Sequence, residues 1–256
     1  SKAVLGVAGE TLYPGRLGIK SALAGVTATI LMALTANLPD AQTIVATFSG
    51  VTTADEITGV GEYRGVPFVV GPIIYATGQT ETLAVAAADA NQAVDQAGFT
   101  AGRSIVFTSD ATTITATADV KGETFKFRWT VKGTGTISSQ VIADPGIFAQ
   151  GSAKPALGVI ADGGTAYAGS LGVSEIASTS AASCVAGGHV DVELLAAAAI
   201  AHGQVLYVEP ATGAKFTGTE SATTIWVPPS FLLPLDQAAS SATYPQGAAA
   251  RVRMGG

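Results

Sequence analysis

Three potential metal ligands, His189, Asp191 and Glu193, stand at alternate positions in the second half of the chain. Residues two apart share a face of a β-strand, so these side chains would converge as the three protein ligands of a catalytic zinc ion do. His202 is a further candidate ligand. The same alternation is typical of the solvent-facing side of a strand, and it would also suit a contact between subunits. We favour the solvent-facing interpretation and predict no metal, no catalytic residue and no cofactor.

The single cysteine, Cys184, lies among small residues and is the other candidate for chemistry. A nucleophilic cysteine needs a base and electropositive surroundings. His189 is near in sequence, but no residue is placed to orient it. We therefore expect a buried, passive thiol. One cysteine cannot form an internal disulfide, so the fold does not depend on an oxidising compartment.

Motifs of the common nucleotide-binding and hydrolytic sites are missing. The glycine-rich stretch 59–65 has neither the dinucleotide-binding nor the P-loop spacing, and the chain has no Gly-x-Ser-x-Gly or His-Glu-x-x-His sequence. Asp89, Asn91 and Asp95 lack the glycine and the final glutamate of a calcium-binding loop. A non-enzymatic protein is the favoured prediction, and a metal-dependent hydrolase that uses His189 and its neighbours stays as the alternative.

The composition points to an assembly. Charged residues make up 12% of the chain and 31 of 256 residues are glycine, whereas soluble domains carry about 25% charged residues. We infer that other subunits cover much of the surface. The net charge of −6 argues against a nucleic-acid partner. The most apolar run, 23–34, is shorter than the roughly 20 residues of a spanning helix, so we predict a buried element and no membrane partner.

The elements that must position these residues fall into three parts. Residues 1–37 are predicted to be an N-terminal arm, over 1–18, followed by the buried apolar segment. Residues 38–140 are predicted to be an α+β domain, with strands at 41–52 and 64–75. Residues 141–256 are predicted to be a small β-barrel or sandwich of short strands between turns.

The α+β part is predicted to contain one Ala-rich helix before a β-hairpin. The helix spans 80–97, with an apolar face of small residues that must lie close against a sheet. The hairpin joins Thr113–Val120 to Thr124–Lys132, because both stretches alternate apolar and polar residues around the turn 121–123. Its inner face would be aromatic and its outer face cationic. The fold class is therefore mainly β with a minor α+β part, built from small β-barrel or sandwich units.

Two stretches carry a resemblance to a known class of proteins. The helix followed by a Thr-rich pair of strands, within 80–131, resembles the order found in head and tail proteins of tailed bacteriophages. Gly203–Phe216, with its Leu-Tyr and Thr-Gly pairs, and the ending Ala248–Met254 resemble the strands of small phage decoration (cement) proteins. The chain is thus most similar to a head decoration protein among tailed-bacteriophage virion structural proteins.

The resemblance implies a function and its partners. The subunit would bind the capsid surface and stabilise the shell at capsomer junctions, after synthesis in the cytoplasm of the host bacterium. Its partners would be the major capsid protein or other virion subunits, and it would form a homo-oligomer, with a trimer favoured. The alternative is a tail tube, tail fibre or adhesin subunit. The residues predicted to contact other subunits are Tyr13, Arg16, Lys126, Arg128, Lys132, Trp226 and Phe231.

Overall fold

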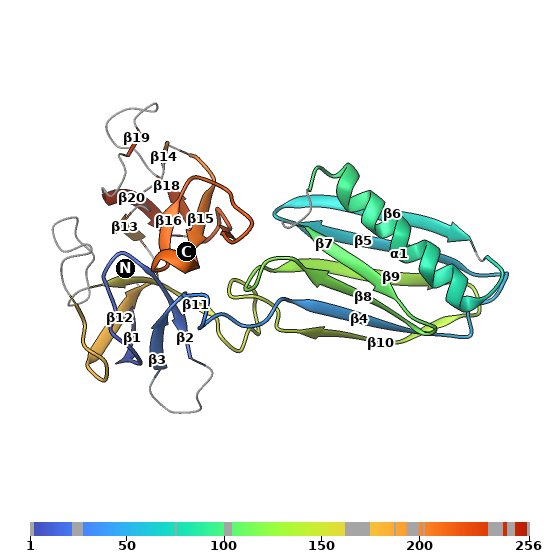
Figure 1. Cartoon of the computed structure of the whole chain (residues 1–256), viewed down its shortest axis with the longest axis horizontal. Coiled ribbons are helices and arrows are strands. Elements are labelled where there is room, and N and C mark those ends of the chain that lie inside the picture. The colour runs from blue at the N-terminus through green and yellow to red at the C-terminus, as the bar shows by residue number, and fades with distance from the viewer. Residues whose placement is uncertain are drawn as a thin grey trace. The chain divides into compact units, whose positions relative to one another are not determined.

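The structure is a computed structural model of the whole chain. It describes residues 3–21, 28–74, 76–99, 104–161, 175–186, 188–193, 200–201, 203–234, 243–244 and 249–254. The chain forms two compact units (Figure 1). We call Ser1–Pro39 with Ile147–Gly256 the barrel unit, and Asp40–Gly146 the sandwich unit.

The barrel unit consists of short strands. They are β1 (Ala3–Ala8), β2 (Leu17–Lys20), β3 (Ala28–Met32), β11 (Ala156–Ala161), β12 (Ala181–Val185), β13 (Gly188–Glu193), β14 (Ile200–Ala201), β15 (Leu206–Glu209), β16 (Lys215–Thr217), β17 (Ile225–Val227), β18 (Leu232–Pro234), β19 (Thr243–Tyr244) and β20 (Ala249–Met254), with a short 3₁₀ helix η1 (Pro210–Thr212). The mainly β fold class predicted from the sequence is therefore confirmed.

A closed barrel in the order β1-β12-β11-β2-β3 forms the centre of this unit. Leu17, Ile19 and Ile30 are fully buried in it. Gly18 lets the strands approach closely, because a Cβ on this residue would lie 2.5 Å from Cys184 Sγ. Side chains fill the interior of such small barrels, so the barrel is a core.

Three smaller sheets complete the described part of the barrel unit: β13-β20-β18, β14-β19 and β16-β15-β17. The strand-turn-strand within Gly203–Phe216 is present. β15 and β16 pair antiparallel across η1, and Gly213 takes the left-handed conformation, with φ of 95°, after η1. That conformation favours glycine, which explains the Thr-Gly pair in the sequence.

The described part of the sandwich unit contains seven strands and one helix. They are β4 (Thr43–Ser49), β5 (Glu56–Tyr63), β6 (Val66–Ile74), α1 (Gln79–Gln96), β7 (Ile105–Ser109), β8 (Thr113–Ala118), β9 (Phe125–Lys132) and β10 (Thr136–Ala143). The strands form one sheet in the order β10-β4-β8-β7 and another in the order β6-β5-β9. The two strands and the helix that the sequence predicts in this part are confirmed.

Aromatic rings fill the space between the two sheets. Phe107, on β7, contacts Phe127 and Trp129, on β9, with ring centroids 4.8 Å and 6.3 Å apart. The helix α1 contacts β6 and β7, and so covers the side of the sandwich where these two edge strands lie (Figure 1). Its buried face includes Ala86 and Ala90, and these small side chains allow the close approach that the sequence predicts.

The predicted hairpin of Thr113–Val120 with Thr124–Lys132 is wrong. The strand β8 pairs with β4 and β7, whereas β9 pairs with β5 in the other sheet. Both stretches alternate because each has one face in the core, and alternation does not identify the partner strand. The helix does precede a hairpin, which is formed by β7 and β8.

The prediction of an extended N-terminal arm is also wrong, because this part of the chain contains the strand β1. The strand β1 pairs with β12 and runs parallel to β3, which closes the barrel. Gly6 passes so close to the Ala28 carbonyl oxygen that no side chain would fit, so β1 lacks a regular apolar face. The structure thus joins residues 1–39 with the C-terminal part, unlike the sequence-based division at 37 and 140. The apolar run 23–34 supplies β3, and its first residues lie outside the described part.

Candidate interaction surface

The outer face of the β6-β5-β9 sheet is formed by every second residue of its strands. Phe125, Phe127 and Trp129 are buried, so the alternate residues of β9 face solvent. These are Lys126, Arg128, Thr130 and Lys132, and all four are exposed. The structure therefore brings together three of the residues predicted to contact other subunits, namely the three cations.

Ion pairs mark the two ends of this face. Lys126 Nζ lies 3.4 Å from Glu62 Oε1, and Lys132 Nζ lies 3.4 Å from Glu56 Oε2. Each pair joins β9 to β5 at directly opposed register positions. Because the side chains are largely exposed, each pair contributes at most about 1 kcal/mol to stability. They set the charge pattern of the face more than they hold the sheet together.

The centre of the same face is apolar. Val60 lies opposite Val69 on one side and opposite Arg128 on the other. The two valines are 58% and 64% exposed, and Ile74, opposite Glu56, is 76% exposed. An apolar centre with a polar rim is the usual arrangement of a protein–protein interface. This face is therefore the candidate interaction surface of the sandwich unit.

Carboxamide side chains bond to the backbone at two edges of the sheets. Gln42 bonds to both the N–H and the C=O of Phe125 at the start of β9. Asn91, on α1, does the same for Phe107 on β7, at 2.8 Å and 2.9 Å. These amides take up backbone groups that another strand would otherwise bind. Asn91 therefore has a structural role, which is to bind the backbone of Phe107.

The remaining predicted contact residues lie in the barrel unit and contact their own chain. Tyr13 donates a hydrogen bond to Glu175 Oε1 at 3.0 Å, and this carboxylate raises the pKa of the phenol. Arg16 is only 7% exposed and so lies inside the unit. Phe231 contacts Phe148 edge-to-face, with ring centroids 5.0 Å apart, and Trp226 is half-buried on β17.

The candidate metal ligands stand at alternate positions of β13, as expected. The register places His189 opposite Arg253 and Asp191 opposite Arg251 on β20. The side chains of β13, and His202, lie outside the described part of the structure. Among the side chains that are described, no three histidine, cysteine, aspartate or glutamate residues gather closely enough to hold a metal ion.

Cys184 is fully buried in the barrel. Burial raises the pKa of its thiol to about 12, because the apolar surroundings disfavour the thiolate. A neutral, enclosed thiol is a poor nucleophile. The side chain fills space against Gly18, which gives it a packing function.

Sequence reasoning missed Val60 and Val69, which form the apolar centre, and the carboxamides of Gln42 and Asn91 that bind the strand backbones. The glycines at 59 and 61 hide the alternation of β5, since they leave room for aromatic rings instead of adding apolar side chains. A glutamine just before a strand, such as Gln42, has no distinctive sequence pattern. The exposed valines could have been found only from the strand register.

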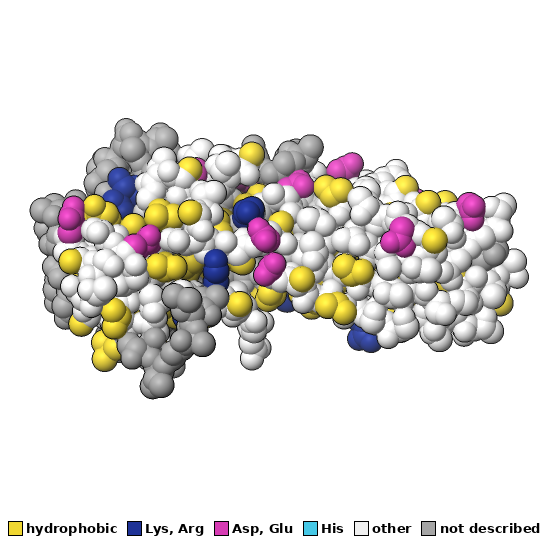
Figure 2. All heavy atoms as spheres, turned by 60° about the horizontal axis from the view of Figure 1, so that its bottom comes forward, with side chains coloured by type: hydrophobic (Ala, Val, Ile, Leu, Met, Phe, Trp, Pro, Cys, Tyr) yellow, Lys and Arg dark blue, Asp and Glu magenta, His cyan; other side chains and the backbone are white. Residues whose placement is uncertain are grey.

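Figure 2 shows one face of the molecule, on which hydrophobic side chains reach the surface of both units and charged side chains are sparse. This agrees with the low content of charged residues.

Within the described residues, no helix is long and apolar enough to span a bilayer. No family model matches the chain, and no curated protein or solved structure was found to match it.

Proposed function

We propose that the chain is a non-enzymatic structural subunit of a tailed-bacteriophage virion, which binds the capsid surface and cements the shell at capsomer junctions. The resemblance of Gly203–Phe216 and Ala248–Met254 to strands of decoration proteins supports the virion class. The observation that carries a contact with other chains is the exposed apolar centre at Val60 and Val69, between two ion pairs. Contiguous apolar surface with a polar rim marks interaction sites on soluble proteins.

The contribution of this face can be stated in physical terms. Covering apolar surface gains about 25 cal/mol per Å², less the cost of association. A small favourable binding free energy at each capsid site is therefore sufficient, because the contact is repeated over the whole shell. Arg128, beside Val60, adds a charge that favours one orientation of the partner. The partner is the major capsid protein or another virion subunit, and the chain itself forms a homo-oligomer, for which we favour a trimer.

A tail tube, fibre or adhesin subunit is the second candidate, because the same apolar face would serve a tube or fibre contact equally well. The two candidates differ in the assembly that the purified chain forms. A decoration subunit gives a discrete, small oligomer, whereas a tube subunit gives rings or long polymers. A host-binding fibre or adhesin binds glycans or cell surfaces.

The first experiment is the molar mass of the purified chain by size exclusion with light scattering, followed by binding to undecorated heads. The heads are assembled from the capsid gene of the same phage, and bound chain is measured by co-sedimentation. We expect a trimer that binds the heads. The double variant Val60→Lys/Val69→Lys should bind at least about tenfold more weakly, because two buried charges oppose the contact. Val85→Lys, at an exposed position of α1, is the matched control.

The outcomes separate the candidates. Rings or polymers, with no binding to heads, would replace the decoration assignment by a tail tube. Full binding by the double variant would show that the valine face is not the contact. A monomer that does not bind heads at any concentration would refute the proposal as a whole.

A further inference from the structure

The two sheets of the sandwich unit differ in width, because one has four strands and the other has three. The helix α1 covers the side formed by β6 and β7, and the edge strands β9 and β10 lie on the other side. Ile142, on β10, pairs in register with Ile44, which faces the core. Ile44 is 2% exposed, but Ile142 is 55% exposed. The strand β10 therefore lies beyond the edge formed by β9, and among the described strands none covers its inner face.

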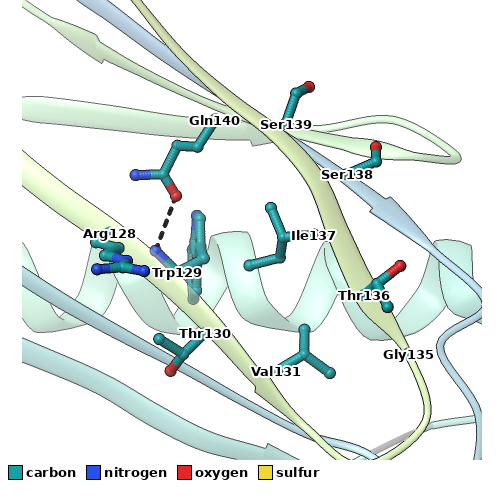
Figure 3. A pocket seen from close by; sticks show the side chains of 10 residues that line it. All are labelled: Arg128, Trp129, Thr130, Val131, Gly135, Thr136, Ile137, Ser138, Ser139 and Gln140. Carbon is teal, nitrogen blue, oxygen red and sulfur yellow. Dashed lines mark hydrogen bonds between the residues drawn. The ribbon is translucent and has the colours of Figure 1, made fainter.

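An open groove of about 770 Å³ lies between β9 and β10 at this place. Its apolar lining includes Val131 and Ile137, which are both half-buried, and its polar lining includes Thr130 and Thr136. Figure 3 shows Ile137 and Gln140 projecting from β10 toward β9. An elongated groove between two strand edges, with alternating apolar and polar walls, matches an extended peptide better than a compact ligand.

Two backbone groups of β9 face this groove, and the side chain of Gln140 forms a hydrogen bond with each of them. Gln140 Oε1 accepts from the Trp129 N–H at 3.1 Å (Figure 3). Gln140 Nε2 donates to the Phe127 C=O at 2.8 Å. An adjacent strand would bind these same groups. Gln42 makes similar bonds in the buried core, but Gln140 is only half-buried. A competing strand can therefore reach Gln140 and replace it.

A cation at the groove, Arg128, indicates that the bound segment carries a negative charge. Lys126 and Lys132 each have a glutamate opposite on β5, but Arg128 has Val60 opposite. In the part of the chain that is described, no carboxylate lies within ion-pair distance of Arg128. This residue lines the groove beside Trp129. A guanidinium binds a carboxylate through two parallel hydrogen bonds, so the groove favours a segment with aspartate or glutamate at this position.

We propose that the groove between β9 and β10 binds an extended segment of another protein chain. The segment adds to β9 as a fourth strand, displaces the Gln140 carboxamide, packs β-branched side chains on Val131 and Ile137, and places a carboxylate at Arg128. Main-chain hydrogen bonds supply affinity, and the alternate side chains supply specificity. This site lies at the strand edge and does not depend on the virion assignment, and Arg128 is the one residue that the argument shares with the Val60 face.

A random nonapeptide display library, panned on the immobilised full-length chain, tests this proposal. We expect enrichment of sequences that alternate β-branched with polar residues and hold one aspartate or glutamate. The best peptide is then synthesised, and its affinity is measured by fluorescence anisotropy. Arg128→Gln should weaken its binding about tenfold, whereas the matched variant Lys132→Gln should stay within about twofold of the wild type. Gln140→Ala should strengthen binding severalfold, because the competing carboxamide is removed.

Two further measurements make the result decisive. Circular dichroism checks that each variant is folded, and Val69→Lys, on the outer face, should leave peptide binding unchanged. The proposal is overturned if the library yields no enriched sequence. It is overturned equally if the best peptide binds the Arg128→Gln and Gln140→Ala variants as it binds the wild type. Failure of the wild-type chain to bind heads, with intact peptide binding, would count against the proposed function alone.

Discussion

The side chain of Gln42 is joined to the backbone of Phe125 by two hydrogen bonds. Gln42 Nε2 donates to the Phe125 carbonyl oxygen at 2.8 Å, and the Phe125 N–H donates to Gln42 Oε1 at 2.9 Å. Gln42 directly precedes β4, and Phe125 begins β9, so one carboxamide connects a strand of one sheet with a strand of the other. Both residues are nearly inaccessible to water. The bonds therefore satisfy backbone groups that solvent does not reach.

Replacing Gln42 by leucine should destabilise the sandwich unit. The change leaves a buried donor and a buried acceptor of Phe125 without partners, and each unsatisfied group costs about 1–3 kcal/mol. Urea unfolding followed by Trp fluorescence gives the free energy of unfolding. Gln92→Leu is the matched control, because Gln92 is exposed on α1. Equal stability of the Gln42→Leu variant and the wild type would show that water replaces the carboxamide.

Removing the charge of Glu123 should be among the most damaging single changes. Glu123 is 2% exposed, and it accepts hydrogen bonds from Arg64, at 2.7 Å and 3.1 Å, and from the Tyr63 hydroxyl. Burial and the adjacent carboxylate raise the pKa of Tyr63, so the phenol stays a donor. Breaking a buried ion pair on one side costs about 3–5 kcal/mol.

The measurement is the free energy of unfolding of Glu123→Gln, Arg64→Met and the double variant. We expect the double variant to lose much less than the sum of the single changes, since no unpaired charge stays buried. Strictly additive losses would mean that the two side chains do not stabilise each other.

Asp55 should make the sandwich unit sensitive to acid. Its carboxylate accepts backbone hydrogen bonds from Gly135, at 2.9 Å, from Thr52, at 2.5 Å, and from Thr134. These bonds, with Gly135 and Thr52 the largest causes, lower the pKa of Asp55 to about 2. The unfolded pKa is about 3.9. Because the folded pKa is the lower one, the stabilisation is present above pH 4 and is lost as the pH falls toward 2.

The test of Asp55 is the urea midpoint of the wild type and of Asp55→Asn between pH 6 and pH 2.5. The variant should be less stable at pH 6, because an amide cannot accept from all three donors as a carboxylate does. The difference between the two proteins should shrink as the pH falls. Asp95→Asn, at an exposed position of α1, should show no such trend. A difference that is constant over this range would refute the assignment.

The sequence was sufficient for some elements and not for others, and the reason is the range of the interactions. The helix α1 was predicted because its Ala-rich face repeats within one turn of its own backbone. The buried face of β9 was predicted because Phe125, Phe127 and Trp129 alternate within one strand. The partner of β9 was missed, since pairing with β5 depends on residues far away in the sequence.

The candidate surfaces show the same division. The cations of β9 follow from local alternation, and they were predicted to make contacts. The apolar centre at Val60 and Val69 depends on the register of three strands, and the groove beside Gln140 depends on the unequal widths of two sheets. Neither property is encoded in any short stretch of sequence. The closure of the barrel by β1 was missed for the same reason.

Gly61 should not tolerate even a methyl group. A Cβ at this position would collide with the rings of Phe68 and Phe127, which stack with centroids 5.7 Å apart. Overpacking of a core costs about 1–3 kcal/mol. We therefore expect Gly61→Ala to lower the urea midpoint. Val60→Ala, at the neighbouring exposed position, should change it little. A Gly61→Ala variant as stable as the wild type would mean that the ring stack moves freely.

Cys184 should be unreactive in the folded protein. The thiol is fully buried, and burial raises its pKa to about 12, so almost no thiolate exists at pH 8. Since the thiolate is the reactive form, Ellman's reagent should release no signal from the native chain and one equivalent after unfolding in urea. The urea concentration at which the thiol becomes reactive should follow the unfolding of the barrel unit, because Cys184 lies on β12. Rapid reaction of the native protein would show that the barrel opens locally. A catalytic or redox role for Cys184 would then have to be considered again.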